Sequence, residues 1–168
     1  CRSRAVAAPK GDPDGFTAAL RGCELAGWRR RGKYLVAKLE RDGEPAGELG
    51  VHLRMTGQFQ WLQREERPPC PHTRVRFLSE KHELRFVDVR SFGELWFVPL
   101  GTPTEQVITG LTRLGPEPFS DAFNANYLRQ RLKGSSRPIK NALLDQALVA
   151  GVGNIYADES LFVAGIRP

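Results

Sequence analysis

Short apolar runs separated by turn residues are the feature that most constrains the fold of this chain. Five of them lie between residues 33 and 100: KYLVAKLE, GELGVHLRMTGQFQWL, RVRFLSE, ELRFVDV and GELWFVPL. Their Val, Leu, Phe and Trp content and the Gly, Pro and polar residues between them are typical of β-strands. In two neighbouring runs, Val75 and Phe77, then Leu84 and Phe86, alternate with polar residues. This spacing predicts antiparallel strands with one buried face, within an antiparallel β-sandwich.

The second part of the chain shows helical spacing of its apolar residues. EQVITGLTRLGPEP predicts a short helix, and SDAFNANYLRQRLKG predicts a helix capped by Ser120. RPIKNALLDQALVA predicts a third helix with Pro138 near its start, and NIYADESLFVAG a last helix with Asn154 as its cap. We therefore expect an α+β fold, with a β-sandwich portion at residues 1–101 and a helical portion at residues 102–168.

The charge balance narrows the class of partner. The 168 residues carry 25 Lys and Arg against 19 Asp and Glu, a net charge of +6, and the pI is near 9.6. This favours a polyanionic partner. No apolar run approaches the roughly 18 residues that cross a bilayer and no signal peptide is recognisable, so we expect a soluble, intracellular protein.

The cysteines and the two ends of the chain lead to two further predictions. Cys1, Cys23 and Cys70 are few and scattered, which favours free thiols over disulfides or a thiolate zinc site. Because the chain begins at Cys1 without an initiator Met and stops just after a helix-stop signal, we expect it to be a piece of a longer protein.

The GVGN stretch at residues 151–154 joins the last two predicted helices. Its glycines permit positive φ, and its amides would lie near the positive end of the final helix, a geometry that suits a phosphate oxygen. A helical hairpin in which Asn154 only caps explains the same residues. Asp158 and Glu159 favour the helix dipole but oppose a bound phosphate. The turn alone leaves both interpretations open.

Basic residues lead into the first apolar run in WRRRGKYL. Arg29, Arg30 and Arg31 fit a solvated strand edge, which protects against strand-to-strand aggregation. Lys33 differs, because as the first residue of an apolar strand it can project into a cleft as a fixed ammonium. There it would contact a phosphate or transfer a proton.

Met55, Arg90 and Phe92 lie in HLRMTG and DVRSFGELW, near the ends of predicted strands. Taken singly, Met55 and Phe92 fit core positions, and Arg90 fits an ion pair with Asp88. Taken together, they supply a flexible apolar wedge, a planar cation and an aromatic ring. A protein needs these groups to enter a duplex, fill the gap left by an extruded base and stack on its neighbours.

The three histidines complete the candidates. No carboxylate–histidine spacing accompanies His52, His72 and His82, so we expect no metal site. His72, beside Arg74 in PPCPHTRVRF, is better placed as a phosphate donor. The sequence shows no nucleophile–base arrangement of the Ser/His/Asp type and no phosphate-loop signature.

Six short sequence segments, taken in order along the chain, match one protein family. They are RRGKYL, HLRMTGQF, HTRVRF, LRFVDVRSFGELW, LGPEPFS and IKNALLDQALVAGVGNIYADESLFVAGI. In these segments the chain resembles the formamidopyrimidine-DNA glycosylases, which are bacterial base-excision enzymes that remove oxidised purines such as 8-oxoguanine and then cleave the abasic strand. The resemblance implies a two-layered β-sandwich followed by a helix-two-turn-helix module.

The resemblance also implies roles for individual residues. Lys33 matches a lysine that assists catalysis and β-elimination near the scissile phosphate, and Glu159 matches an acidic residue that supports the active site. Met55, Arg90 and Phe92 match a trio inserted into the duplex in place of the flipped base. The implied DNA-binding positions are His72, Arg90, Ser136, Arg137, Lys140, Gly153, Asn154 and Tyr156.

Three parts of the family pattern differ in this chain. Ser136 stands where the family commonly places a basic DNA contact, and Arg137 is the nearest cation. The family's nucleophile is the amine of an N-terminal proline in a PELPE opening, whereas this chain begins at Cys1. The family ends in a four-cysteine zinc finger that carries an arginine for a second elimination, and this segment would follow Pro168. We therefore expect zinc in the full-length protein and no cofactor in this piece.

These observations favour a base-excision repair protein. We expect the full-length parent to be a glycosylase and abasic-site lyase acting by β,δ-elimination, and this piece to bind and distort double-stranded damaged DNA without catalysis. We expect a monomer in the bacterial cytoplasm, associated with the nucleoid and not with membranes. The alternative is a nucleic-acid-binding module without catalysis, resembling a small ribosomal protein with a similar glycine–asparagine turn.

Overall fold

The structure, a computed structural model, describes residues 5–168, so Cys1 lies outside the described residues. The chain divides into two compact units. Of the described residues, the first comprises 5–30 and Tyr34–Ile108, and the second comprises Arg31–Lys33 and Thr109–Pro168. Each unit is described separately below.

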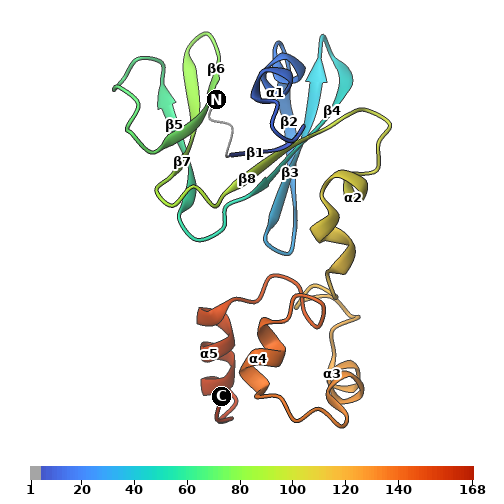
Figure 1. The fold of residues 1–168 in the computed structure, drawn as a ribbon. Coiled ribbons are helices and arrows are strands. Elements are labelled where there is room, and N and C mark those ends of the chain that lie inside the picture. Colours follow the sequence, from blue (N-terminus) through green and yellow to red (C-terminus); the bar gives the residue numbers. More distant parts are fainter. Residues whose placement is uncertain (1–4) are drawn as a thin grey trace. The chain divides into compact units, whose positions relative to one another are not determined.

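Two β-sheets form the first unit (Figure 1). A five-stranded sheet has the order β1-β8-β4-β3-β2, and a three-stranded sheet has the order β5-β7-β6. The bounds in the larger sheet are β1 (Val6–Ala8), β2 (Glu24–Arg31), β3 (Tyr34–Arg41), β4 (Glu44–His52) and β8 (Glu94–Val98). Those in the smaller sheet are β5 (Gly57–Gln63), β6 (Thr73–Leu78) and β7 (His82–Asp88). The expected β-sandwich is confirmed. The sequence analysis placed Arg29–Arg31 at a strand edge but predicted neither the full strand β2 nor the short strand β1, the two edges of the larger sheet.

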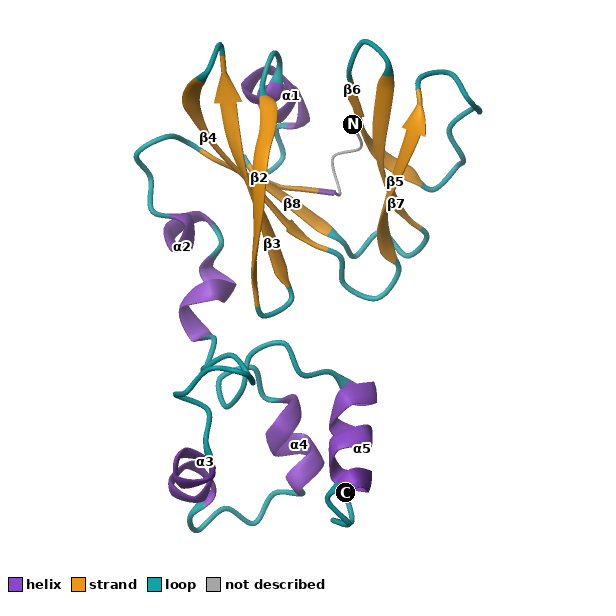
Figure 2. Cartoon of the chain, turned by 180° about the vertical axis from the view of Figure 1, so that it is seen from behind, coloured by secondary structure: helices purple, strands orange, loops and turns teal. Residues whose placement is uncertain are grey.

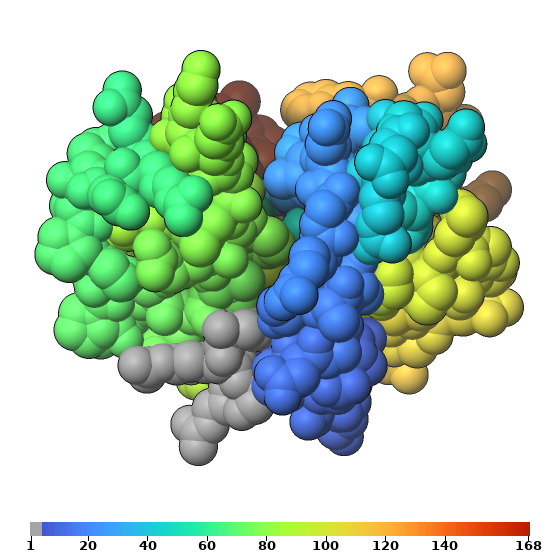
Figure 3. Space-filling view, turned by 90° about the horizontal axis from the view of Figure 1, so that it is seen from above, coloured from blue at the N-terminus to red at the C-terminus, as the bar shows by residue number. Residues whose placement is uncertain are grey.

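Apolar side chains from both sheets and from helix α1 (Pro13–Leu20) form one core. Leu49 of β4, Leu95 of β8 and Phe86 of β7 are each fully buried, and Phe16 of α1 packs with them. Seen from above, α1 and β2 lie beside the strands of the smaller sheet (Figure 3). An α+β fold with a two-layered first unit follows from this packing.

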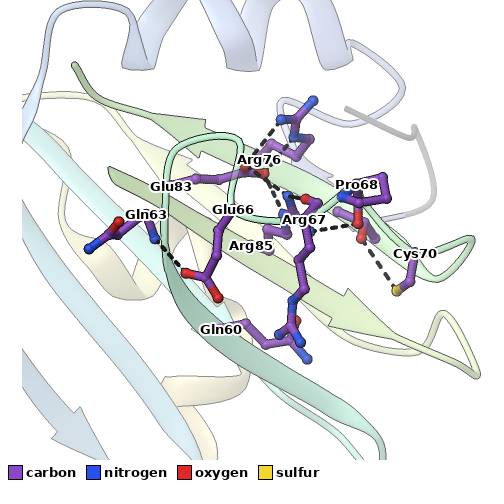
Figure 4. Close-up of polar contacts among 10 residues, drawn as sticks. Gln60, Gln63, Glu66, Arg67, Pro68, Cys70, Arg76, Glu83 and Arg85 are labelled. Carbon is purple, nitrogen blue, oxygen red and sulfur yellow. Dashed lines mark hydrogen bonds and ion pairs between the residues drawn. The ribbon is translucent and has the colours of Figure 1, made fainter. Parts of the chain in front are cut away.

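The antiparallel strand pair predicted from alternating apolar and polar residues is confirmed. The polar face of this pair, which was expected to face solvent, is however covered at β7. Val75 pairs with Phe86 and Phe77 with Leu84 across antiparallel β6 and β7. On the opposite face of β7, Glu83 and Arg85 are also buried. The reason is that the chain after β5 folds over this face, where Arg85 donates hydrogen bonds to the carbonyl oxygens of Arg67 and Pro68 (Figure 4).

Short helices build the rest of the chain. They are α2 (Thr104–Val107) at the end of the first unit, then the 3₁₀ helix η2 (Thr109–Arg113), α3 (Ala125–Leu132), α4 (Ile139–Leu144) and α5 (Asn154–Val163). Helices α4 and α5 lie side by side (Figure 2). Ala142 of α4 and Ala157 of α5 are both completely buried. None of the helices in the described part of the chain is both long and apolar enough to cross a membrane.

Three predicted helix boundaries are wrong. Helix α3 starts after Asn124, whose side chain accepts from the amide of Tyr127, whereas the Ser120 hydroxyl donates to the Glu117 carbonyl. Helix α4 ends at Leu144 instead of continuing to residue 150, because the Asp145 carboxylate accepts the amide of Ala147 and turns the chain. At α5, Gly153 is the N-cap and Asn154 is already helical.

Candidate nucleic-acid interface

The chain reverses between β4 and β5, which places Met55 at the tip of a tight loop. The predicted single strand through Met55 is therefore wrong. The amide of Gly57 donates to the carbonyl oxygen of Leu53 at 3.0 Å, and a β-carbon on Gly57 would collide with that carbonyl. Met55 is 73% exposed. Tight closure at Gly57 thus presents a large apolar side chain to solvent.

Met55, Arg90 and Phe92 converge on one surface of the first unit. Arg90 Nη1 lies 2.9 Å from Met55 Sδ, and Arg90 Cζ lies 4.8 Å from the centroid of the Phe92 ring. Phe92 is 52% exposed. Core positions for Met55 and Phe92 are therefore wrong, and Arg90 reaches Asp88 through its backbone amide instead of its guanidinium. We call these three exposed side chains the wedge.

Strand register explains why residues so far apart in sequence meet. Gly57, the first residue of β5, pairs with Asp88, the last residue of β7. The end of the loop before β5 therefore lies beside the start of the loop after β7. His52 of β4 pairs with Glu94 of β8, which brings the other ends of the same two loops together. Arg54 in one loop also forms an ion pair with Glu94, at 2.5 Å.

His72 is the other candidate DNA contact of the first unit. It is exposed just before β6, and its carbonyl oxygen accepts the amide of Asp88 at 3.0 Å. The neighbouring Arg74 is buried and donates from Nε to the carbonyl oxygen of Asp88 at 2.8 Å. The backbone around His72 is thus tied to the end of β7, where the wedge loop begins.

Arg31–Lys33, which comprises the last residue of β2 and the turn before β3, belongs to the second unit. Glu117 Oε1 accepts the amide of Gly32 at 2.6 Å and the guanidinium of Arg31 at 2.9 Å. Arg31 also donates to the carbonyl oxygens of Leu114 and Gly115. Arg31 is therefore a bound structural cation, unlike the solvated one that we expected.

Lys33 occupies the turn itself and does not begin the strand. Its side chain is exposed overall, yet partial burial of the ammonium lowers the pKa of Lys33 below its usual value. A β-carbon added to Gly153 would lie 3.6 Å from Lys33 Nζ. An ammonium group therefore stands beside the N-cap of α5, where helix amides also favour an anion.

Gln146 shapes the chain that leads into α5. Its Nε2 donates to the carbonyl oxygens of Leu144 at 3.0 Å and Val152 at 2.8 Å, and its Oε1 accepts the amide of Gly151 at 2.9 Å. Gly151 has φ +87°, whereas Gly153 is extended with φ −119°. Of the two glycines expected to need positive φ, only Gly151 has it.

The remaining candidates of the second unit lie on or near α4 and α5. Lys140 forms an ion pair with Asp158 and Arg137 with Asp145, while Ser136 is exposed. Such partly exposed pairs are weak, typically under about 1 kcal/mol, so both cations can exchange their partners for a phosphate. The predicted site residues Asn154 and Tyr156, at the start of α5, and Glu159, further along the same helix, are all exposed.

Sequence reasoning missed Asp88 and Gln146 as site residues. Both are polar side chains that mainly bind backbone groups of nearby loops. Neither belongs to a periodic pattern, although Asp88 stands inside the quoted DVRSFGELW. The available signal was a polar residue shortly before a residue with positive φ, since Ser91 follows Asp88 by three positions and Gly151 follows Gln146 by five.

The described residues contain no cluster of metal-ligating side chains. Among residues 5–168, no group of three or more His, Cys, Asp or Glu side chains is arranged to hold a metal ion. These residues therefore offer no site that fits the zinc ion implied by the family resemblance. Cys23 and Cys70 are free thiols in the described structure, as expected.

Comparison with protein families gives two matches. The N-terminal domain of formamidopyrimidine-DNA glycosylases matches residues 1–95, and the H2TH domain of the same enzymes matches residues 114–168. Two curated relatives named formamidopyrimidine-DNA glycosylase are similar along the whole chain. The protein from Parasynechococcus marenigrum is 63% identical over 100% of this chain and 59% of its own length. The one from a Synechococcus species is 60% identical over 99% and 58%.

Solved structures agree with these matches. A Lactococcus lactis Fpg in complex with DNA that contains an abasic site has a TM-score of 0.84 and 33% identity, covering 99% of this chain and 58% of that one. MutM (Fpg) from Thermus thermophilus has a TM-score of 0.74 and 45% identity, covering 90% and 53%. The chain thus spans less than two thirds of the length of these proteins.

Proposed function

Because the chain belongs to the formamidopyrimidine-DNA glycosylase family, we propose that it is part of a base-excision repair enzyme that binds damaged double-stranded DNA and removes oxidised purines. The convergence of Met55, Arg90 and Phe92 as an exposed wedge is the observation that carries the proposal. A net charge of +6 supports a polyanionic partner.

The wedge has the chemistry needed to replace a base inside a duplex. Met55 is flexible and apolar, Phe92 can stack on a neighbouring base, and Arg90 already lies over the Phe92 ring. Extruding a base costs a few kcal/mol of stacking and pairing, and less at a damaged base. Filling the gap recovers part of this cost, so insertion favours lesions.

The second unit is proposed to grip the phosphate backbone. Gly153, the N-cap directly before Asn154, lies beside the ammonium of Lys33, and helix amides together with a cation bind phosphate well. Contacts of this kind position the protein without reading sequence. The further proposed DNA-binding residues are His72, Ser136, Arg137, Lys140 and Tyr156.

The proposed reaction joins base removal to strand cleavage. A secondary amine bonds to C1′ while the glycosidic bond breaks, and the base leaves with the bonding electrons and takes up a proton. The C1′–O4′ bond then opens, O4′ keeps the bonding electrons and takes up the proton that the amine gives up, and an iminium forms at C1′. Loss of a proton from C2′ of this iminium expels the 3′-phosphate with the electrons of the C3′–O bond. We assign the nucleophile to none of the residues described here. Lys33 would assist beside the scissile phosphate, and Glu159 would support the active site.

Borohydride trapping tests this function in the protein at its natural length. A duplex with an abasic site should be crosslinked to the protein, because the reductant fixes the iminium. Fluorescence anisotropy should show tighter binding to a duplex with 8-oxoguanine opposite cytosine than to the undamaged duplex. Binding without either crosslinking or lesion preference would instead support a non-catalytic nucleic-acid-binding module, and no binding at all would refute both.

A further inference from the structure

Asp88 is a buried carboxylate that connects the two loops of the wedge. It is the last residue of β7 and is 0% exposed. Its Oδ1 accepts the Thr56 hydroxyl and, at 3.2 Å, the amide of Arg90. Its Oδ2 accepts the amide of Gly93 at 2.7 Å. Since Thr56 follows Met55 and since Arg90 and Gly93 flank Phe92, one side chain ties together both loops that carry the wedge.

The backbone of Asp88 is equally well held. Its amide donates to the carbonyl oxygen of His72, and its carbonyl oxygen accepts the Arg74 guanidinium. Burial would raise the pKa of Asp88, but hydrogen bonds from Thr56 and from backbone amides of the second loop outweigh it and lower the pKa below its usual value. The carboxylate is therefore ionised at neutral pH, and hydrogen bonds to an ionised acceptor are stronger than neutral ones.

The two loops need such a restraint. Arg54 has φ +54° and Ser91 has φ +57°, a left-handed conformation that disfavours residues with a β-carbon. At Gly93, a β-carbon would collide with the Phe86 ring. Loops of this kind hold one shape only where their surroundings fix it, and the Asp88 carboxylate supplies fixed acceptors to both.

We propose that Asp88 is a positioning residue for the wedge, which sets Met55, Arg90 and Phe92 in their inserting arrangement before DNA binds. The inference rests on the proposed function of the wedge. Ordering the loops in advance removes an entropic cost from insertion itself. Loss of Asp88 should therefore impair insertion more than overall DNA binding, since the phosphate contacts are made by other residues.

The test measures insertion directly in the protein at its natural length. A duplex carries 2-aminopurine next to an abasic-site analogue, and its emission rises when the wedge disturbs stacking. Asp88→Asn keeps the size of the side chain but turns a donor toward the Gly93 amide. We expect the emission change at saturating protein to fall about fivefold or more while the Kd changes by less than about threefold.

Matched variants separate positioning from loss of stability. Leu39→Ala removes a buried side chain on β3. Leu39 pairs with Gly47, at the opposite end of the β3–β4 pair from His52, where the wedge loop begins. We expect it to lower Tm and to keep the emission change. Thr56→Val, which removes only the hydroxyl donor, should reduce the emission change and covers the case in which Asp88→Asn does not fold. In a Met55→Ala background, Asp88→Asn should add little, since both act on the same step.

Two results would overturn the inference. One is an emission change in Asp88→Asn and Thr56→Val no smaller than in Leu39→Ala. The other is full additivity with Met55→Ala. If the wild-type protein itself produced no emission change on the lesion duplex, the proposed function of the wedge would fail, which is a separate result.

Discussion

Lys33 and Gly153 face each other in the second unit, with Lys33 Nζ 3.6 Å from the position that a β-carbon on Gly153 would take. An ammonium and the N-cap of a ten-residue helix therefore border the same small space. Both attract an anion, and the absent side chain at Gly153 leaves room for one. This relationship makes the phosphate-binding proposal for the start of α5 testable by adding single methyl groups.

Gly153→Ala is expected to leave the fold intact and to weaken DNA binding. Its φ of −119° and ψ of −178° suit alanine, and the added methyl makes only ordinary contact with Lys33. The same methyl would occupy the approach of a phosphate, so we expect an affinity loss of about tenfold at unchanged Tm, measured by anisotropy and thermal melting. Gly151→Ala is the control: at φ +87° it should cost about 1 kcal/mol of stability. Unchanged affinity in Gly153→Ala would place the phosphate elsewhere.

Asn154→Ala should weaken binding to damaged and intact duplexes by the same factor, about three- to tenfold, because phosphate contacts do not read the base. Its side chain does not cap α5, so Tm should stay unchanged. Asn124→Ala reverses the pattern, since Asn124 caps α3 through the Tyr127 amide and its loss should cost about 1 kcal/mol without affecting DNA affinity. Loss of affinity for the damaged duplex alone would show that Asn154 contacts the lesion instead.

The sheet architecture could be predicted from the sequence because alternation and turn residues act locally. The spacing of Val75, Phe77, Leu84 and Phe86 predicts the antiparallel β6–β7 pair, and in the structure these apolar residues pair with one another. The buried Glu83 on the opposite face could not be predicted, because the segment that covers it comes from the chain after β5. A polar position in an alternating strand normally faces water.

The wedge was predicted as a group of residue types, but its geometry depends on tertiary register. Nothing near Met55 in the sequence indicates that Arg90 lies beside it; the pairing of Gly57 with Asp88 does. The early end of α4 has the same kind of cause. Apolar spacing continues to residue 150, yet the side chains of Asp145 and Gln146 capture backbone groups that a longer helix would use.

Glu83 should make the stability of the first unit depend on acid pH. Hydrogen bonds from Arg76, then from Arg85, lower the pKa of Glu83 from 4.5 to about 2 in the fully buried site of Figure 4. The stabilisation is therefore complete above pH 4.5 and is lost as the pH falls toward 2. A shift of this size corresponds to roughly 3 kcal/mol. Urea unfolding between pH 7 and pH 2.5 measures it.

Glu83→Gln should lower stability at pH 7 and flatten its decline toward pH 2.5 relative to the wild-type protein. Glu66→Gln is the matched control, because Glu66 is exposed in the segment that covers Glu83 and accepts only the Gln63 amide in Figure 4. It should leave both the stability and its pH dependence nearly unchanged. Parallel curves for Glu83→Gln and wild type would assign the acid dependence to other carboxylates.

Gln146→Glu should loosen the turn before α5 while changing almost nothing in side-chain size. A carboxylate still accepts the Gly151 amide but cannot donate to the carbonyl oxygens of Leu144 and Val152, so oxygen would face oxygen at both. Leaving such groups unpaired costs about 1–3 kcal/mol. We expect faster amide hydrogen exchange at residues 151–154, and weaker binding to damaged and intact duplexes alike, since the turn carries the proposed phosphate grip.

The control for this variant must carry the same new charge. Gln130→Glu adds one negative charge at an exposed site on α3 in the same unit, so it reproduces long-range repulsion of DNA without touching the turn. Its hydrogen exchange at residues 151–154 should match wild type, and its affinity loss should disappear as salt screens the charge. In Gln146→Glu a loss should persist at high salt, because the geometry of the grip has changed. Equal salt dependence in the two variants would show that Gln146 acts through charge alone and that the shape of the turn is not what holds the phosphate.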